Sequence, residues 1–553
     1  MATTGGRPRR VAAHVAVVVA YLVALAPFAG GAVLDATRGW LPYGDDAVIS
    51  WRAADVLSTH GPLVGQITLD RSPGHTAFDL GPLLYWLLTV PVHLDPAHGT
   101  LWGAALWCAV AAGVTVTAGR AVGGPMGALA AAAVFPVLAL ALPEMPLDPA
   151  WNPSIGLCWY VAMAACAVAV GSGRRRWLPA LVTAGSIAAQ CHLSFAVAVP
   201  GVVAVALGLG LAATPAGTRR SWRGPVLVTT AIGVACWTPT VIQQLTGRPG
   251  NLTAILQGTG GHHVIGWLDA VRALGTAVGP HPLWTQQLAT MPFFTFIGAI
   301  VQGDLGAAVV VTVLLLAMAI GALRSHHTSL GAAAAVALAL DAGVVVSVAR
   351  FPSGQFLALH YTLRSADAAG ILSWLVLTWG GITGCQAAVR WRHAHRQQRL
   401  GRPATAGHPR WRQVGTIALI GASLAAAASV PASLAAERDD PSLALAARIS
   451  AQARAIDTAM RPVLGRQPVQ MTIVPDPALP TLEGLSNVLL TLGVAWLART
   501  QGYDVRMSAW YAAGIGPQAG PLPGIRQVRV TFPRGRPVAT LVPGQSAPAP
   551  RSG

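Results

Sequence analysis

Hydrophobic residues along this chain form long, nearly uninterrupted runs rather than the short alternations typical of a soluble fold. Because a transmembrane helix needs about 20 mostly apolar residues, eleven of these runs are predicted to cross a membrane. They lie at approximately 11–34, 99–119, 123–143, 153–172, 177–191, 194–213, 224–242, 303–323, 328–349, 368–389 and 414–434. The pattern therefore predicts an α-helical polytopic membrane protein, with residues 1–434 as its transmembrane domain.

Two longer polar segments interrupt these runs on the predicted outer side. The first outer loop, residues 35–98, contains helical patterns at 47–58 and 81–92 that are too short to cross a bilayer. Helices lying at the interface are expected there, with Trp51, Tyr85 and Trp86 at headgroup depth. The second, residues 243–296, is a long outer loop of the kind that usually carries function.

The last part of the chain has a different composition. Helical patterns at 442–460 and 482–501 alternate with strand patterns at 469–474 and 526–532. Residues 435–542 are therefore predicted to form a small α/β domain outside the membrane. The Pro/Gly/Ser-rich tail, residues 543–553, is predicted to be disordered.

Charge is distributed unevenly over the two sides of the predicted bundle. All 37 basic residues are Arg, and only 10% of the 553 residues are charged, yet the net charge is +17. With a cytoplasmic N-terminus, 18 Arg and no acidic residue fall on the inner side, whereas the outer loops hold twelve acidic residues and seven Arg. The positive-inside rule then predicts a plasma-membrane protein with its C-terminal domain extracytoplasmic. The excess of Arg reflects the orientation of the protein in the membrane, so the lipid bilayer and not nucleic acid is the expected partner.

Several common kinds of site are absent from the sequence. The six Cys residues fall in apolar runs without a CxxC pair, which argues against disulfides and zinc fingers. P-loop, HExxH and GxSxG motifs are also missing, so ATP-driven transport and the common hydrolase chemistries lose support. Asp341, the one acid well inside a span, is predicted to make a polar contact between helices.

Asp45 and Asp46 follow the first span in the segment Tyr43-Gly44-Asp45-Asp46-Ala47. Adjacent carboxylates repel each other, which raises one pKa and suits a general base. The pair suits a metal or a basic ligand equally well, so a divalent cation stays an open alternative and no metal site is assigned. Either acid could instead cap the helix that starts near Ala47.

Other polar residues gather in the outer loops near this pair. Polar groups at a membrane face are unfavourable unless they are paired or functional, so these residues are predicted to bind substrate. They are His60, Arg71, His75, Asp79, Glu144, Asp148, Asn152, Gln190, His192 and Gln243.

These features together resemble the GT-C superfamily of membrane glycosyltransferases. The resemblance rests on the cytoplasmic start of the first span, the first outer loop with Asp45-Asp46, the many spans and the C-terminal extracytoplasmic domain. The segment Asp79-Leu80-Gly81-Pro82-Leu83-Leu84-Tyr85-Trp86 completes it. The resemblance implies a polyprenyl-phosphate sugar as donor, a glycan, lipid or protein acceptor, and an inverting transfer on the outer side. It also implies that Asp45 or Asp46 is the base that deprotonates the acceptor hydroxyl.

The Ala-rich, all-Arg composition looks actinobacterial, which would imply an arabinosyl- or mannosyltransferase of cell-wall biosynthesis. The predicted α/β C-terminal domain departs from the β-sandwich modules of the large arabinosyltransferases. A departing phosphate needs positive groups. The candidates are Arg71, Arg248, Arg350, His360 and Arg364, and Arg364, just before the tenth span, is preferred. Arg364 could alternatively anchor the helix at the membrane interface.

Two further classes of function remain open on the sequence alone. A lipid or polysaccharide transporter or flippase would need charges along a membrane path, and Asp341 is alone there. A non-catalytic membrane scaffold presenting the C-terminal domain would have no use for the acidic first loop.

Overall fold

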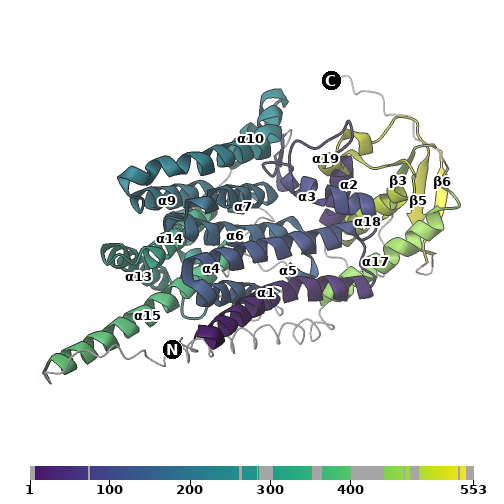
Figure 1. The fold of residues 1–553 in the computed structure, drawn as a ribbon. Helices are drawn as coiled ribbons and strands as arrows, with labels where there is room; N and C mark the ends of the chain where they lie inside the picture. Colours follow the sequence, from purple (N-terminus) through teal and green to yellow (C-terminus); the bar gives the residue numbers. More distant parts are fainter. Residues whose placement is uncertain are drawn as a thin grey trace.

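A bundle of long apolar helices makes up most of the protein, and a small sheet with its helices covers one end of the bundle (Figure 1). The computed structural model describes residues 6–72, 75–142, 144–260, 264–282, 284, 303–351, 364–399, 441–465, 467–473, 485–533 and 536–543. The predicted span 414–434, the tail from 544, His360 and part of the loop 243–296 lie outside these residues.

The helices of the first half of the chain alternate between long and short. The long ones are α1 (Gly6–Thr37), α4 (Gly99–Ala141), α6 (Asn152–Gly171), α7 (Leu178–Cys191), α9 (Ala198–Ala212) and α10 (Arg223–Thr246). Shorter elements at the turns are α2 (Gly44–Asp55), α3 (Leu83–Leu94), α5 (Glu144–Leu147), η1 (Arg175–Trp177), α8 (Leu193–Ala196) and η2 (Ala216–Trp222).

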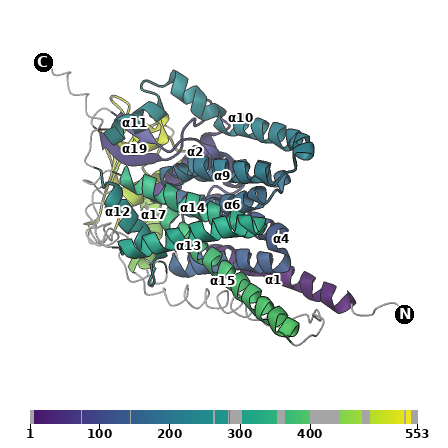
Figure 2. The same ribbon diagram turned by 90° about the vertical axis from the view of Figure 1, so that its left-hand side faces the viewer.

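The second half continues the bundle and then leaves it. Its helices up to residue 399 are α11 (Asn251–Gly260), α12 (Trp267–Val278), α13 (Leu305–Arg324), α14 (Thr328–Ala349) and α15 (Arg364–Arg399). The C-terminal part comprises α17 (Pro441–Met460), β3 (Val469–Ile473), α18 (Leu485–Thr500), β4 (Val505–Arg506), α19 (Ala509–Ile515), η8 (Pro517–Ala519), β5 (Gln527–Thr531) and β6 (Val538–Val542). Figure 2 shows α13, α14 and α15 together on one side of the bundle.

The predicted polytopic membrane class is confirmed. Eight described helices are long and apolar enough to cross a membrane. Ten of the eleven predicted spans coincide with described helices, because α4 contains two of them and α7 supplies another with 14 residues. At 1.5 Å per residue α7 is only about 21 Å long, which is shorter than a hydrocarbon core of about 30 Å.

The chain reverses direction within α4. Gly124 has φ +63°, a left-handed conformation that glycine adopts without steric penalty. On either side of it the backbones of Gly119 and Gly127 touch, since a Cβ on Gly119 would come 2.5 Å from the carbonyl oxygen of Gly127. The two predicted spans at 99–119 and 123–143 are therefore antiparallel neighbours.

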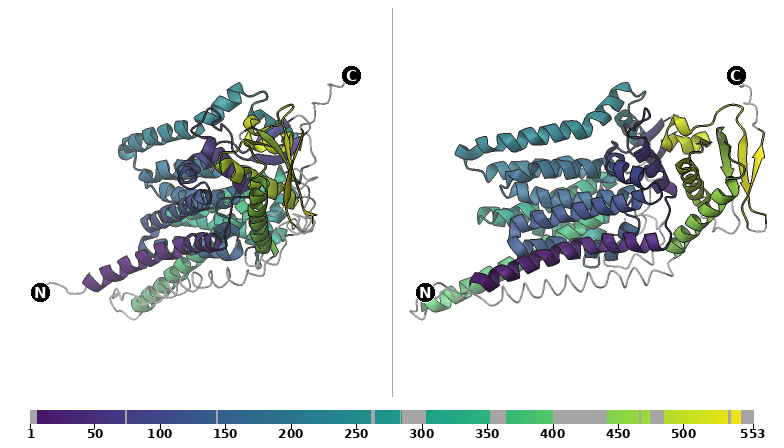
Figure 3. Two further views of the ribbon diagram at one scale, coloured as in Figure 1. Left: turned by 90° about the vertical axis from the view of Figure 1, so that its right-hand side faces the viewer. Right: turned by 45° about the vertical axis from the view of Figure 1, so that its right-hand side comes forward.

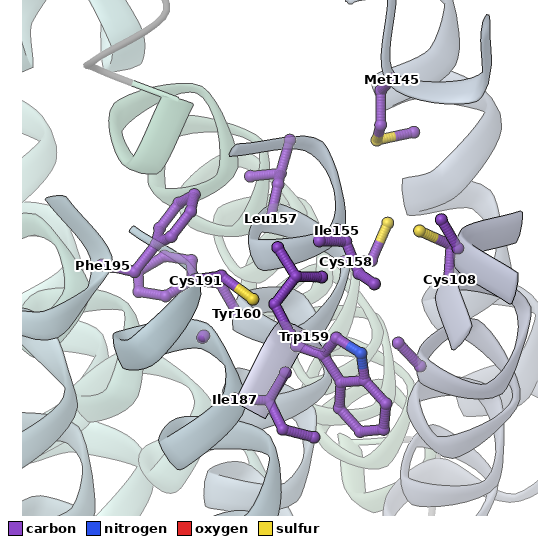
Figure 4. Close-up of a cluster of buried hydrophobic side chains, with 14 of the residues drawn as sticks. Cys108, Met145, Ile155, Leu157, Cys158, Trp159, Tyr160, Ile187, Cys191 and Phe195 are labelled. Atoms are coloured by element: carbon purple, nitrogen blue, oxygen red, sulfur yellow. The ribbon is translucent and has the colours of Figure 1, made fainter. Parts of the chain in front are cut away.

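Helix α6 forms the centre of the bundle. It is apolar on all sides and almost every residue in it is buried, as expected for a helix surrounded by other helices. Figure 4 shows its side chains Leu157, Trp159 and Tyr160 among those of the neighbouring helices. The Tyr160 ring lies 5.1 Å from that of Phe195. This packing fixes the position of Asn152, the first residue of α6.

The first outer loop contains the two predicted helices, α2 and α3, and also an unpredicted hairpin. Strands β1 (Ile67–Ser72) and β2 (His75–Phe78) pair antiparallel between the helices. The predicted headgroup positions of Trp51 and Tyr85 are wrong, because these side chains are 5% and 0% exposed inside the protein. Trp86 is 39% exposed, as a residue at a membrane interface would be.

The C-terminal part covers the end of the bundle at which this loop lies (Figure 3). Its four strands are ordered β4-β3-β5-β6, with β3 parallel to β4 and β5, and β6 antiparallel to β5. The predicted small α/β region is thus confirmed, although β4, β6 and α19 were not predicted. Helix α18 packs directly against α2, which joins the two parts of the chain.

The predicted polar contact of Asp341 is confirmed. Its two carboxylate oxygens, on α14, accept hydrogen bonds of 3.2 and 3.1 Å from the hydroxyl of Ser373 on α15. A buried acid inside a membrane bundle is thereby given a partner on the next helix.

Close packing at Gly156 on α6 is expected to limit substitution there. A Cβ would lie 2.8 Å from the Phe195 ring and 3.0 Å from Cys191, so Gly156→Leu should overpack this point and lower stability by about 1–3 kcal/mol. Gly208→Leu on α9 is the matched control, since nothing lies within 4 Å of that Cβ position. The melting temperature of the purified protein is the readout, and equal values for the two variants would contradict this packing.

Candidate active site

Helix α2 begins immediately before the acidic pair, at a glycine that the fold requires. Gly44 has φ +52°, and a Cβ there would come 2.3 Å from the Leu489 side chain of α18. Only glycine allows both this backbone conformation and this close approach. The C-terminal part therefore packs directly onto the residue that positions Asp45 and Asp46.

Asp45 is accessible to solvent and held by two side chains from other segments. Its Oδ1 accepts a 3.1 Å hydrogen bond from Gln66 Nε2, and its Oδ2 accepts one of 3.2 Å from Trp151 Nε1. The surrounding protein raises the pKa of Asp45, and the two hydrogen bonds oppose that rise. The side chain itself remains exposed, so solvent and a ligand can reach it.

Asp46 has the opposite environment. It is 2% exposed, and neither carboxylate oxygen receives a hydrogen bond from a described donor. Burial first, and then Asp148, Asp45 and Asp35, raise the pKa of Asp46 well above its usual value. Interacting buried carboxyls titrate as a unit, and one proton held between Asp46 and Asp148 relieves their repulsion.

Asp148 completes this buried pair from the turn before α6. Burial raises its pKa to about 6, while its interaction with Asp46 and a 3.3 Å hydrogen bond from the Trp151 backbone lower it. The indole N–H of Trp151, in the same turn, also donates to Asp45. The turn Asp148–Trp151 thus contacts both members of the acidic pair.

The capping alternative for the acidic pair is wrong. The residue that precedes α2 is Tyr43, and no side-chain hydrogen bond caps the helix. The bonds of Asp45 run to Gln66 and Trp151, which belong to other segments of the chain.

Asp79, Asn152 and Gln190 meet beside this site, where the sequence placed them on one face. Asp79 accepts a 3.1 Å hydrogen bond from Asn152 Nδ2 and one of 3.0 Å from the Leu193 backbone. Burial nevertheless raises the pKa of Asp79 well above its usual value. Gln190 donates to the Cys236 carbonyl and accepts from the Leu83 amide. These contacts connect the residue after β2 with α6 and α8, and α7 with α3 and α10.

His192 and Gln243 make contacts that organise the backbone. The His192 ring accepts a hydrogen bond from the Ser194 amide at the start of α8, and burial lowers its pKa to about 4. The ring is therefore neutral at pH 7. Gln243 Oε1 accepts from the Asn251 amide at 2.7 Å, at the start of α11. Neither contact excludes the predicted role in binding, which stays a prediction.

The remaining predicted residues make no described contact with Asp45. His60 is exposed beyond the far end of α2 and lies with Asp55, not with Asp45. For Arg71, His75 and Glu144 only the backbone is described, in β1, β2 and α5. Arg364 is 6% exposed at the start of α15, with Nη1 3.9 Å from Asp367 Oδ2. That burial argues against the alternative in which Arg364 anchors the helix in the membrane interface.

Three residues of the site were not selected from the sequence. Gln66 and Trp151 hold Asp45, and Asp35 on α1 lies near Asp148. Trp151 follows Asp148 by three residues, a spacing that lets one turn serve two acids. Within the described ranges, no group of three or more His, Cys, Asp or Glu residues is arranged to hold a metal ion.

Comparison with known proteins yields similarity only at the level of three-dimensional structure. No protein-family model matches the sequence, and no curated protein is significantly similar to it. The crystal structure of ArnT from Cupriavidus metallidurans bound to undecaprenyl phosphate superposes with a TM-score of 0.45 and 16% identity, over 98% of each chain. The apo state of the same protein gives a TM-score of 0.46 and 16% identity, over 95% of this chain and 93% of that one.

The raised pKa of Asp148 should make stability depend on pH. The native carboxyl holds its proton to about pH 6 and the unfolded one only to about 3.9. Its contribution is therefore complete below about pH 4 and is lost as the pH rises through 6. Asp148→Asn should flatten the fall in melting temperature over this range, whereas Asp269→Asn, at an exposed ion pair with Arg272, should not. Parallel curves of melting temperature against pH for wild type and Asp148→Asn would contradict a raised pKa for Asp148.

Proposed function

We propose that this protein is a membrane glycosyltransferase that moves a sugar from a polyprenyl-phosphate donor to a cell-envelope glycan, lipid or protein acceptor. The observation that carries the proposal is the contrast between the two acids. Asp45 is exposed and oriented by Gln66 and Trp151, whereas its neighbour Asp46 is buried against Asp148. One ionised, oriented carboxylate beside a protonated pair is suited to general-base chemistry.

In the proposed reaction Asp45 takes the proton of an acceptor hydroxyl. The hydroxyl oxygen forms a bond to the anomeric carbon of the donor sugar from the side opposite the phosphate. The bond between that carbon and the phosphate oxygen breaks, and the polyprenyl phosphate leaves with the electron pair. Attack from the opposite face inverts the anomeric configuration. General-base assistance typically contributes 10²- to 10⁴-fold to such a step.

Gln66 and Trp151 have a positioning role in this proposal. Each donates to a different oxygen of Asp45, so the carboxylate plane is held in one orientation. Gln66 is in turn fixed by a 3.1 Å hydrogen bond from the Tyr85 hydroxyl to its Oε1. Hydrogen bonds to the charged form also keep the base deprotonated near neutral pH.

The distribution of charge supports a reaction on the extracytoplasmic side. The site, the first loop and the C-terminal part share one end of the bundle. Arg174, Arg175 and Arg219 lie in turns at the other end, where the positive-inside rule expects cytoplasm. A polyprenyl-phosphate donor would present its phosphate at headgroup depth on the outer side.

Arg364 is the described residue that best suits the departing phosphate, with Arg71 and His360 as further candidates from the sequence. Its guanidinium is buried at the start of α15, and α15 packs against α4, α6 and α8 near the site. A guanidinium there would carry the positive charge that a departing phosphate needs. The composition favours an arabinosyl or mannosyl group as the sugar, and a divalent cation remains an alternative means of neutralising the phosphate.

The two other classes fit the structure less well. A transporter needs charged groups along a membrane path, and Asp341 is occupied by Ser373 between two helices. A scaffold gives no reason for two other chain segments to converge on Asp45. Both would predict that wild type transfers no sugar.

Replacing the proposed base should separate the roles of the two acids. Asp45→Asn keeps the shape of the side chain but removes the base, so kcat should fall by about 10²- to 10⁴-fold. Asp46→Asn mimics the protonated acid and should retain most activity. The assay is transfer from a labelled polyprenyl-phosphate sugar by purified protein, with Asp269→Asn as a surface control. Full activity in Asp45→Asn would rule out this base, and no transfer by wild type from a broad donor panel would reject the enzyme class.

Loss of one hydrogen bond to Asp45 should shift the pH profile. Trp151→Phe keeps an aromatic ring but removes the indole N–H, which stabilises the ionised carboxylate, so the pKa of Asp45 should rise. Because the base must be deprotonated, the acidic limb of kcat against pH should move to higher pH, by about one unit. Trp107→Phe, whose indole donates to the Leu87 carbonyl, is the matched control. An unmoved acidic limb in Trp151→Phe would exclude Asp45 as the group that titrates.

A further inference from the structure

A pocket of about 290 Å³ lies between the first loop and the C-terminal part, at the end of α2 remote from Asp45. Asp55 and Trp51 of α2 line it together with His60 from the turn that follows. The C-terminal part supplies Arg499, Tyr503 and Gln518. The pocket therefore exists only when the two parts of the chain are in contact.

The walls of the pocket are held by polar contacts across that junction. Asp55 forms an ion pair with Arg499, whose Nη2 lies 2.7 Å from Asp55 Oδ1. Asp55 also accepts a 2.8 Å hydrogen bond from Gln518 Nε2. The Arg499 guanidinium also lies 4.6 Å from the centre of the Trp51 ring, within the range of a cation–π contact. These contacts fix the lining side chains before any ligand arrives, which lowers the entropic cost of binding.

Two lining residues keep polar atoms that no described protein group satisfies. Trp51 is 5% exposed and its Nε1 has no hydrogen-bond partner, and Gln518 Oε1 is likewise buried without one. Buried polar atoms without partners are unfavourable. Both atoms are closed off from solvent, so the hydrogen bonds to a ligand fall to lining side chains such as His60, whose ring can both donate and accept, as sugar hydroxyls do.

Charge in the lining argues against an anionic ligand. Asp55 and Asp504 both line the pocket, with Arg499 as the one described cation there apart from the titratable His60. Arg499 is already paired with Asp55, so little positive charge is left for a phosphate or carboxylate. Tyr503 adds a half-buried aromatic ring, and an apolar ring beside a few polar groups is the usual composition of a small-molecule site.

We propose that this pocket binds one neutral sugar residue of the acceptor glycan. The proposal rests on the function proposed above and extends it by naming a saccharide acceptor and a second point at which it is held. Asp55 follows Asp45 by ten residues in one helix, so the pocket is roughly 15 Å from the base. An acceptor of several sugars can reach both points, whereas a single sugar at the base cannot.

Direct binding tests the pocket without requiring transfer. Full-length protein in detergent is titrated with neutral oligosaccharides of arabinose, mannose, glucose and galactose, and with inorganic phosphate for comparison. At least one saccharide should bind saturably, and Tyr503→Ala and His60→Ala should weaken it about tenfold. Tyr503→Phe, which keeps the ring, and Thr458→Ala, at an exposed position of α17 outside the lining, should bind as wild type does.

Melting temperatures show whether each variant is folded, and His60→Ala, at an exposed position, keeps the test usable if Tyr503→Ala is not. Three results would overturn the pocket assignment. They are no saturable binding of any saccharide to wild type, equal affinity in Tyr503→Ala and wild type, and displacement of the saccharide by phosphate.

The transfer assay separates this inference from the proposed function. With an acceptor of four sugars, Tyr503→Ala should raise KM about tenfold and leave kcat unchanged, and with a single-sugar acceptor it should change neither. If wild type binds saccharide through Tyr503 but transfers no sugar, the pocket stands and the proposed transfer fails. If transfer depends on Asp45 while Tyr503→Ala alters neither saccharide binding nor KM, the pocket assignment fails and the enzyme stands.

Discussion

A carboxylate at the end of an apolar helix bundle must be hydrated, paired or protonated, because an isolated buried charge is strongly unfavourable. The acids of this chain follow that constraint in different ways. Asp45 is exposed to water. Asp46 and Asp148 lie next to each other, and the pKa of each is raised. Asp79 accepts hydrogen bonds from Asn152 at the start of α6 and from the Leu193 amide at the start of α8. Neighbouring residues of identical chemistry therefore have different surroundings, and different roles become available to them.

The C-terminal part creates this difference as much as the membrane bundle does. Leu489 of α18 occupies the space beside Gly44, and Gly493 of the same helix lies against Pro42 and Tyr43. The backbone before the acidic pair is thus buried under α18, while Asp55 at the other end of α2 is held by Arg499. Helix α2 is clamped at both ends by one helix, so the base and the distant pocket share a single rigid element. A sugar bound at one end would be positioned relative to the other without any movement of the loop.

Much of the fold was accessible from the sequence because apolar runs long enough to cross a membrane have few alternative structures. The pattern also predicted α2, α3, α17 and α18 closely. It missed the β1–β2 hairpin and strands β4 and β6, since two- to six-residue strands leave little periodicity to read. The positions of Trp51 and Tyr85 were wrong for a different reason. Their amphipathic side chains suit a headgroup region. Instead, Trp496 and Arg499 of α18 cover Trp51, and the helix of Tyr85 packs against α2, α4 and α7.

The acidic residues of the site could be predicted from the sequence, but several of the residues that contact them could not. Asp45, Asp79, Asp148, Asn152 and Gln190 were selected as a group, and the structure brings them to one end of the bundle. Gln66, Trp151 and Asp35 were not selected, because single amide, indole and carboxyl groups carry no spacing signal. His60 was expected near Asp45 because the two residues are close in sequence. Helix α2 is twelve residues long, however, and His60 lies beyond its other end, with Asp55.

The central claim is that Asp45 is ionised at neutral pH while Asp46 holds a proton beside Asp148. Infrared difference spectra of the carboxylic-acid C=O stretch at pH 7 measure this directly in single variants of the full-length protein. The account predicts that the band of one protonated carboxyl disappears in Asp46→Asn and persists in Asp45→Asn. Loss of that band in Asp45→Asn but not in Asp46→Asn would reverse the assignment of the two acids and contradict the proposed base.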